Sequence, residues 1–194
     1  MLSIAVGAEE KRSLMSQHYP KIQIIAHQAA WWGCILAVKG HMPILAAGVM
    51  FTFTFFHLWM NRPQFKTELL LVMAAMLVGG LLDSFLVLSG ALQFHPPGEF
   101  GLPLPLWMWG LWAGFGGTLR FSMNWLVSQP WRGFLAGALV GPMVYSGGRT
   151  LEVVTLGTPE TTSFVLIAVA WALILGSLGL YLRWQAPHPP SITT

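Results

Sequence analysis

A single carboxylate, that of Asp83, lies in the middle of a long apolar segment. Residues 69–92 contain no other ionisable side chain. A carboxylate that faced lipid in a membrane would cost about 2.5–3.5 kcal/mol or more. On a helix, Gly79, Gly80 and Gly90 share a face with Asp83. We therefore expect Asp83 to point toward protein, at a place where a neighbouring helix comes close.

A second group of polar side chains could meet Asp83 from another apolar segment. Tyr145, Arg149 and Glu152 are spaced i, i+4, i+7, which puts them on one face of a helix. Asp83 lies ~12 Å below the end of its own helix, within reach of a long arginine. The pattern predicts a ligand site in which Arg149 holds an anionic group, Tyr145 donates a hydrogen bond, and Asp83 orients Arg149 or carries a proton. A structural ion pair that fixes helix register is the alternative.

Other polar residues lie toward the opposite end of the apolar segments. Arg120 and Asn124 are spaced i, i+4, and Arg120 is a second candidate partner for Asp83. His27 and His57 fall at similar depth on consecutive segments, so they could ligate a b-type haem. Histidines near helix ends are more often held by neighbouring side chains, and no further metal ligands accompany this pair. We therefore expect no metal and no cofactor.

Six long apolar segments must position these residues. They run over residues 22–38, 44–60, 67–91, 106–127, 131–150 and 162–184. Each is close to the ~20 residues that a membrane-spanning helix needs. The chain is 55% hydrophobic and 9% charged, whereas about a quarter of a soluble domain is charged. We expect an all-α, polytopic transmembrane bundle of six helices over residues 22–184, with inverted halves of three helices each as one arrangement. Residues 1–21 are expected to form a polar tail or short cytoplasmic helix, and residues 185–194 a disordered tail.

The distribution of basic residues predicts the orientation of the bundle. One side would hold Lys11, Arg12, Lys21, Arg62, Lys66, Arg132 and Arg183, and the other side only Lys39 and Arg149. The positive-inside rule then puts both termini in the cytoplasm. These residues also account for the basic net charge, and no basic patch is interleaved with exposed aromatic residues as in nucleic-acid-binding proteins. We expect membrane lipid as a partner and no nucleic acid.

Small residues and tryptophans predict how the helices pack and where they meet the membrane surface. Gly110 and Gly114 in the fourth segment, and Gly133, Gly137 and Gly141 in the fifth, are spaced four residues apart. Such faces let helix backbones approach closely, so we expect these two neighbours to pack against each other, with a GxxxG dimer as the alternative. The fourth segment begins with Trp107, Trp109 and Trp112. These are typical of an interfacial aromatic belt, and a ligand-binding aromatic box is the other interpretation.

Several motifs occur together with a resemblance to a known family. The chain contains, in this order, WWGCILAVKGHMP, FHLW, LLDSFLV, PLWMWGLWAGFGGTL and GALVGPMVYSGG. Over residues 25–184 it resembles a family of small bacterial inner-membrane proteins of unknown function. The resemblance implies six membrane-spanning helices and no established activity. The residues that match the family are Trp32, His57, Asp83, Ser84, Trp107, Ser122, Trp125, Gly141, Pro142 and Tyr145. Arg120 departs from the pattern, because a small polar residue is expected after GGTL.

These patterns predict a protein of the bacterial inner membrane that binds or moves a lipid or small amphiphile. The polar site would comprise Asp83, Tyr145, Arg149 and Glu152, with Arg120 and Asn124 as further candidates. A lipid-modifying enzyme with Asp83 as general acid or base, or an accessory subunit of such an enzyme, is the first alternative. A b-haem redox subunit and an assembly partner without a ligand are the others. Enzymatic and non-enzymatic roles both stay open at this point, as does the oligomeric state.

Overall fold

Long helices make up most of the chain. The computed structural model describes the backbone of residues 2–185 and the side chains of residues 18–181, apart from residue 127, and of residue 183. The helices are α1 (Leu2–Lys39), α2 (Pro43–Met60), α3 (Phe65–Leu88), α4 (Leu106–Thr118), the short α5 (Asn124–Val127), α6 (Pro130–Thr150) and α7 (Glu160–Gln185). A one-turn 3-10 helix (Arg62–Gln64) precedes α3, and a second (Glu99–Gly101) precedes α4. Of the tail predicted for residues 185–194, all but Gln185 lies outside the described residues.

The surface of the bundle is apolar. Within the described part of the chain, three helical stretches are long and apolar enough to cross a membrane: Pro43–Met60, Arg62–Leu88 and Glu160–Tyr181. Large apolar side chains also point outward from several helices, among them Ile44, Leu88 and Met143, each at least 71% exposed. Soluble monomers rarely expose large continuous apolar surfaces. These features indicate a membrane protein.

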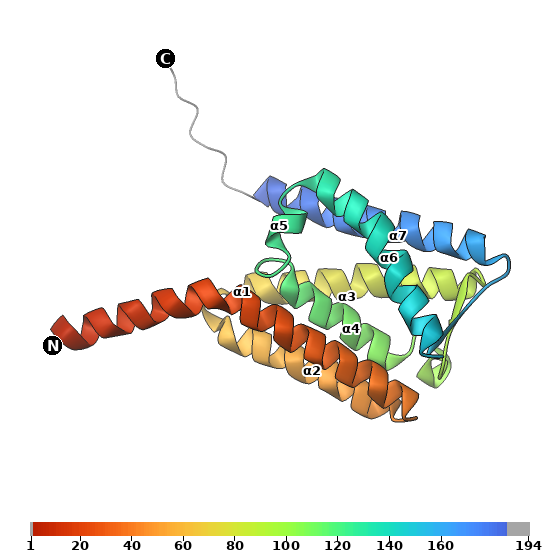
Figure 1. Cartoon of the computed structure of the whole chain (residues 1–194), viewed down its shortest axis with the longest axis horizontal. Helices are drawn as coiled ribbons and strands as arrows, with labels where there is room; N and C mark the ends of the chain where they lie inside the picture. Colours follow the sequence, from red (N-terminus) through yellow and green to blue (C-terminus); the bar gives the residue numbers. More distant parts are fainter. Residues whose placement is uncertain (1, 186–194) are drawn as a thin grey trace, which may run out of the picture.

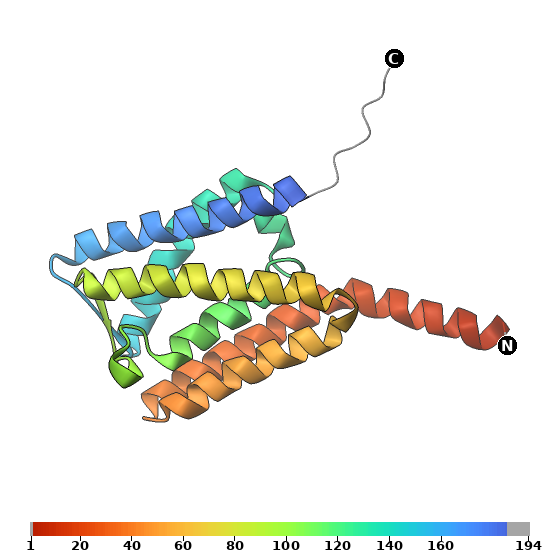
Figure 2. The ribbon, with the colours of Figure 1, turned by 180° about the vertical axis from the view of Figure 1, so that it is seen from behind.

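The helices pack in two groups that meet along α3. Helices α1, α2 and α4 lie side by side, and α6 packs along α7 (Figure 1). Seen from behind, α3 lies between α7 and the pair α1–α2 (Figure 2). Helix α4 packs against both α2 and α3. The fourth apolar segment therefore joins the first three, and the two halves of the sequence do not form separate bundles of three helices.

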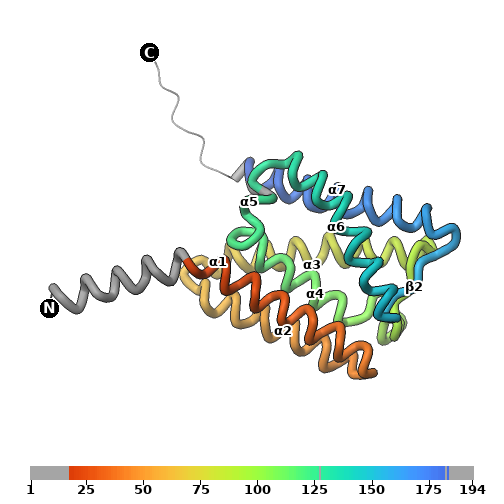
Figure 3. The backbone as a smooth tube through the Cα atoms, viewed as in Figure 1, coloured from red at the N-terminus to blue at the C-terminus, as the bar shows by residue number. Residues whose placement is uncertain are grey.

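A small sheet closes one end of the bundle. Strand β1 (Leu92–Phe94) follows α3, and strand β2 (Val154–Leu156) follows α6. They pair antiparallel, with Phe94 opposite Val154, and the backbone trace shows them at the end of the bundle away from α5 (Figure 3). We call this end the sheet end. The sequence predicted an all-α protein and missed this pair, because three-residue strands are too short to show an alternating pattern.

The fourth apolar segment is not a continuous helix. We expected one helix over residues 106–127, but α4 ends at Thr118 and α5 starts only at Asn124. Glycines lower helix propensity just before the break. At the break, the side chain of Gln23 in α1 replaces helical hydrogen bonds. Its Nε2 donates to the Gly117 carbonyl at 2.9 Å, and its Oε1 accepts from the Ser122 N–H at 3.3 Å.

The glycine face of α6 packs against α7, and the predicted contact with α4 is wrong. A methyl group added at Gly137 would lie 2.2 Å from the carbonyl oxygen of Trp171, and one at Gly133 would lie 2.6 Å from that of Leu175. One at Gly141 would lie 2.6 Å from the Trp171 ring. The two helices therefore approach so closely that only glycine fits between them.

The glycine face of α4 packs against α2 instead. A methyl group at Gly110 would lie 3.0 Å from Cβ of Met50, and one at Gly114 would lie 2.3 Å from Cε of the same residue. The spacing of the glycines correctly predicted close packing. It could not identify the partner, since a flat helix face accepts any neighbour that the rest of the fold supplies.

Candidate functional site

Asp83 joins three helices through hydrogen bonds. Its side chain is fully buried in α3. One carboxylate oxygen accepts a hydrogen bond from the Trp112 indole N–H of α4 at 2.7 Å, and the other accepts one from the Tyr145 hydroxyl of α6 at 2.5 Å. Gly79 leaves room for this contact, because a methyl group there would lie 2.1 Å from the Trp112 ring. Asp83 faces protein as predicted, and the group that approaches its helix closely at Gly79 is the Trp112 ring.

Neither arginine reaches Asp83, so the predicted Asp–Arg ion pair is wrong. Arg149 pairs with Glu160 at 3.0 Å, and both side chains are about half exposed. Arg120 pairs with the buried Glu68 at 3.0 Å. The physical reason is that two aromatic donors already satisfy the oxygens of Asp83. Arg149, one turn beyond Tyr145 on α6, points to the start of α7.

Two further predicted site residues lie apart from Asp83. Glu152 follows the end of α6 with φ 63°, and its side chain is exposed, so it does not share the helix face of Tyr145. Asn124 is also exposed and lies beyond the break after Thr118, so it does not share a face with Arg120. Of the six predicted site residues, the structure brings together only Asp83 and Tyr145.

A buried polar network surrounds His57 at the end of the bundle opposite the sheet end. Its Nε2 lies 3.1 Å from Glu68 Oε2, and its Nδ1 lies 3.0 Å from Gln23 Nε2. Because Gln23 Nε2 also donates to the Gly117 carbonyl, that atom is the amide nitrogen, and His57 Nδ1 must accept. His57 is therefore neutral and donates from Nε2 to Glu68, which also pairs with Arg120.

The same network extends to Tyr19 and Asn61. The Tyr19 hydroxyl lies 3.1 Å from His57 Nδ1 and accepts a hydrogen bond from Asn61 Nδ2 at 2.6 Å. A phenol hydroxyl both donates and accepts, so Tyr19 can donate to His57 Nδ1 while it accepts from Asn61. No role for Glu68 was predicted from the sequence. The available signal was its position eleven residues after His57, across a short turn that brings α2 and α3 together.

The histidine pair considered for haem is not available for that role. Both ring nitrogens of His57 contact other polar side chains. His27 lies outside the network and has no hydrogen-bond partner on either ring nitrogen. In the described part of the chain, no three His, Cys, Asp or Glu side chains gather as a metal site would require.

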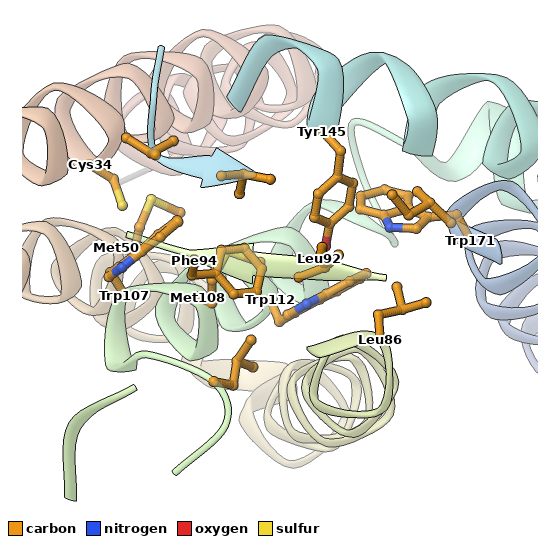
Figure 4. Packing of buried hydrophobic residues seen from close by; sticks show 14 of the residues in the cluster. Cys34, Met50, Leu86, Leu92, Phe94, Trp107, Met108, Trp112, Tyr145 and Trp171 are labelled. Carbon is orange, nitrogen blue, oxygen red and sulfur yellow. The ribbon is translucent and has the colours of Figure 1, made fainter. Parts of the chain in front are cut away.

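A cavity of about 260 Å³ lies between α1, α4 and α6. The sheet closes one side of it through Phe94 and Val154. Aromatic side chains form much of its wall, including Trp31, Trp107, Trp112, Phe115, Tyr145 and Trp171. Several of these side chains gather between the helices (Figure 4). The tryptophans assigned to an interfacial belt are therefore partly internal, since Trp107 and Trp112 are buried.

The mouth of the cavity lies on the side of the bundle. Among the lining residues only Gln28 and Val140 are exposed. Gln28 belongs to α1 and Val140 to α6, and these two helices lie on the same face of the bundle (Figure 1). The cavity therefore opens between α1 and α6.

Few polar groups line this cavity. Tyr145 is one, and its hydroxyl is held by Asp83. His27 is another, and it is only 6% exposed. Trp171 contacts Tyr145 edge-to-face, with ring centroids 6.3 Å apart. Asp83 itself does not line the cavity, so it acts by fixing Tyr145 and Trp112 in the wall.

One described protein family matches most of the chain. The family described as "Protein of unknown function (DUF2878)" matches residues 21–177. No curated protein and no solved structure matches. The matched range covers the described helices from α1 to most of α7 and includes Asp83, Tyr145 and the lining of the cavity. The chain belongs to this family of proteins of unknown function, DUF2878.

Proposed function

We propose that the chain crosses a bacterial cytoplasmic membrane six times, through α1, α2, α3, the broken segment α4–α5, α6 and α7. The apolar outer surface and the three long apolar stretches support this. Helix α4 has 13 residues and is ~20 Å long, short of the ~30 Å hydrocarbon core. Irregular backbone at membrane depth is tolerated where protein buries it. At the break after α4, the Gln23 side chain donates a hydrogen bond to the Gly117 carbonyl. Both chain ends then lie on the basic, cytoplasmic side.

We infer that this protein binds or translocates a lipid or small amphiphile through the cavity between α1 and α6. The observation that carries the proposal is a mostly aromatic cavity whose mouth faces the side of the bundle, where lipid would be. Its volume of about 260 Å³ lies between the ~150 Å³ of a cavity that holds benzene and the ~300–1,000 Å³ of drug-sized pockets. It fits a ring or part of a chain, and an interior of this kind favours apolar ligands.

The arrangement favours binding over chemistry. A general acid or base must lie within hydrogen-bond reach of a substrate atom. Both oxygens of Asp83 already accept hydrogen bonds from Trp112 and Tyr145, and Asp83 does not line the cavity. Asp83 is thus a positioning residue in this proposal, and the lipid-modifying role stays an alternative without a geometric observation in its favour.

Quenching of tryptophan fluorescence by a dibrominated alkane tests the proposal. Four tryptophans line the cavity, so a bound bromine atom would quench them. The blocking variant is Val144→Phe, which enlarges a half-buried lining side chain. The matched control is Met143→Phe, the next residue on α6, which is 71% exposed and does not line the cavity.

We expect saturable quenching in the natural protein and in Met143→Phe, above a linear background from lipid-facing tryptophans. We expect the saturable part to disappear in Val144→Phe. Equal quenching curves for all three proteins would overturn the proposal, because the probe would then reach only the outer surface.

A further inference from the structure

Three side chains in the cavity wall hold buried polar atoms without a hydrogen-bond partner among the described residues: Trp107 and Trp171, whose indole N–H groups can only donate, and His27, whose neutral imidazole can both donate and accept. Neither ring nitrogen has a hydrogen-bond partner, although the side chain is 6% exposed. Its ring neighbour is Phe53, with centroids 5.4 Å apart. His57, by contrast, has partners on both ring nitrogens. Buried polar groups are nearly always hydrogen-bonded, so an unpartnered one that lines a cavity indicates a partner that enters it.

The charges around the cavity limit what that partner can be. Among the residues whose side chains the structure describes, no Lys, Arg, Asp or Glu lines it. Arg120 and Arg149, the two arginines of the predicted site, pair with Glu68 and Glu160. A charged group brought into this apolar space would therefore have no counter-charge, which costs far more than one hydrogen bond returns. The partner must be polar and uncharged.

The depth of His27 in the bundle also favours an uncharged partner. It lies twelve residues before Lys39, the last residue of α1, which corresponds to ~18 Å along the helix. In a hydrocarbon core ~30 Å thick, that position is far from either surface. A phospholipid head group stays at the surface. A small uncharged group on an apolar molecule can lie at this depth.

We propose that the cavity binds an apolar molecule that carries a hydroxyl group, and that His27 forms a hydrogen bond with that hydroxyl. The proposal rests on the proposed function and names its ligand class. A neutral imidazole has one donor and one acceptor nitrogen, and a hydroxyl can pair with either. A hydrocarbon leaves both nitrogens unpaired. A carboxylate could accept from one nitrogen but would bring an uncompensated charge.

The test compares three dibrominated probes that share one chain: the alkane, the primary alcohol and the carboxylate, the last held at a pH where it is ionised. Each is titrated as a mole fraction of detergent against the natural protein, His27→Leu and His27→Gln, with tryptophan quenching as the readout. His27→Leu removes the hydrogen bond and keeps an apolar side chain of similar size. His27→Gln keeps a donor and an acceptor and is the rescue variant.

We expect the natural protein to bind the alcohol roughly five- to tenfold more tightly than the alkane, as one buried hydrogen bond gives. His27→Leu should lose this preference while it still binds the alkane, which also shows that it is folded. His27→Gln should retain part of the preference. The carboxylate should bind more weakly than the alcohol.

Three outcomes would overturn the inference: equal binding of alcohol and alkane by the natural protein, an unchanged preference in His27→Leu, or carboxylate binding as tight as that of the alcohol. The first would mean that a water molecule alone satisfies His27. None of these results contradicts the proposed function. That proposal is tested by Val144→Phe and is contradicted if this variant binds the alkane as well as the natural protein does.

Discussion

The hydrogen bonds at Asp83 should measurably hold α3, α4 and α6 together. Replacing Asp83 with Leu removes the acceptor for two buried donors, Trp112 and Tyr145. Each hydrogen bond to a charged group contributes about 1.5–3 kcal/mol in soluble proteins, and side-chain bonds between membrane helices average ~0.6 kcal/mol with a maximum near ~1.7 kcal/mol. With two bonds lost, we expect Asp83→Leu to lower the free energy of unfolding by about 2–3 kcal/mol.

A double-mutant cycle separates the Asp83–Tyr145 bond from other effects. Tyr145→Phe removes only the hydroxyl, and we expect it to cost about 1–2 kcal/mol. Either single variant already breaks the Asp83–Tyr145 contact. We therefore expect the double variant to lose about 1 kcal/mol less unfolding free energy than the sum of the two single losses. Ser84→Ala is the control, because the Ser84 hydroxyl bonds only to the Gly80 carbonyl of its own helix. It should change stability by less than about 0.5 kcal/mol.

The single cysteine provides the assay. Cys34 is fully buried, so a thiol-reactive fluorophore labels it only when the bundle opens. Thermal scans in detergent should show Asp83→Leu melting roughly 4–12 °C below the natural protein, from the usual ~2–4 °C per kcal/mol for chains of this size. Strictly additive costs of Asp83→Leu and Tyr145→Phe, or a melting temperature for Asp83→Leu equal to that of Ser84→Ala, would show that these hydrogen bonds do not hold the three helices together.

Two further predictions use the same thermal assay. Glu68→Ala should destabilise the protein by about 3–5 kcal/mol, because it leaves His57 and Arg120 without their buried partner; a loss below about 1 kcal/mol would show that the network around His57 is not a stabilising unit. Gly137→Ala should force α6 away from α7 and destabilise strongly, whereas Gly147→Ala, which has nothing within 4 Å of the added methyl group, should be neutral or stabilise by up to about 1 kcal/mol. Equal melting temperatures for the two alanine variants would contradict the close packing of α6 on α7.

Patterns within one helix were predictable from the sequence, and contacts between helices were not. Hydropathy correctly indicated long apolar helices, and the cost of exposing a carboxylate correctly indicated that Asp83 faces protein. The partner of Asp83 was wrong because spacing along α6 shows which residues share a face but not which of them faces inward. That distinction brings Tyr145 to Asp83 and leaves Arg149 at the surface.

The break after Thr118 and the cavity also depend on tertiary structure. The break is stabilised by Gln23, a residue of α1 that lies almost a hundred positions earlier. The cavity exists because α1 and α6 do not close against each other over α4, and no local pattern encodes a gap between helices. The sequence paired His27 with His57 and favoured two histidines held by neighbouring side chains. The structure shows this for His57, which contacts Glu68, whereas His27 has no hydrogen-bond partner among the described residues.

Locating a bound probe would show directly whether the cavity between α1 and α6 holds an apolar alcohol. Crystals of the protein grown with the dibrominated alcohol would give anomalous scattering from bromine. We expect bromine peaks between α1 and α6, next to Trp112 and Tyr145, with the hydroxyl end of the probe toward His27. Bromine peaks confined to the outer, lipid-facing surfaces of the helices, with the cavity empty, would contradict this expectation.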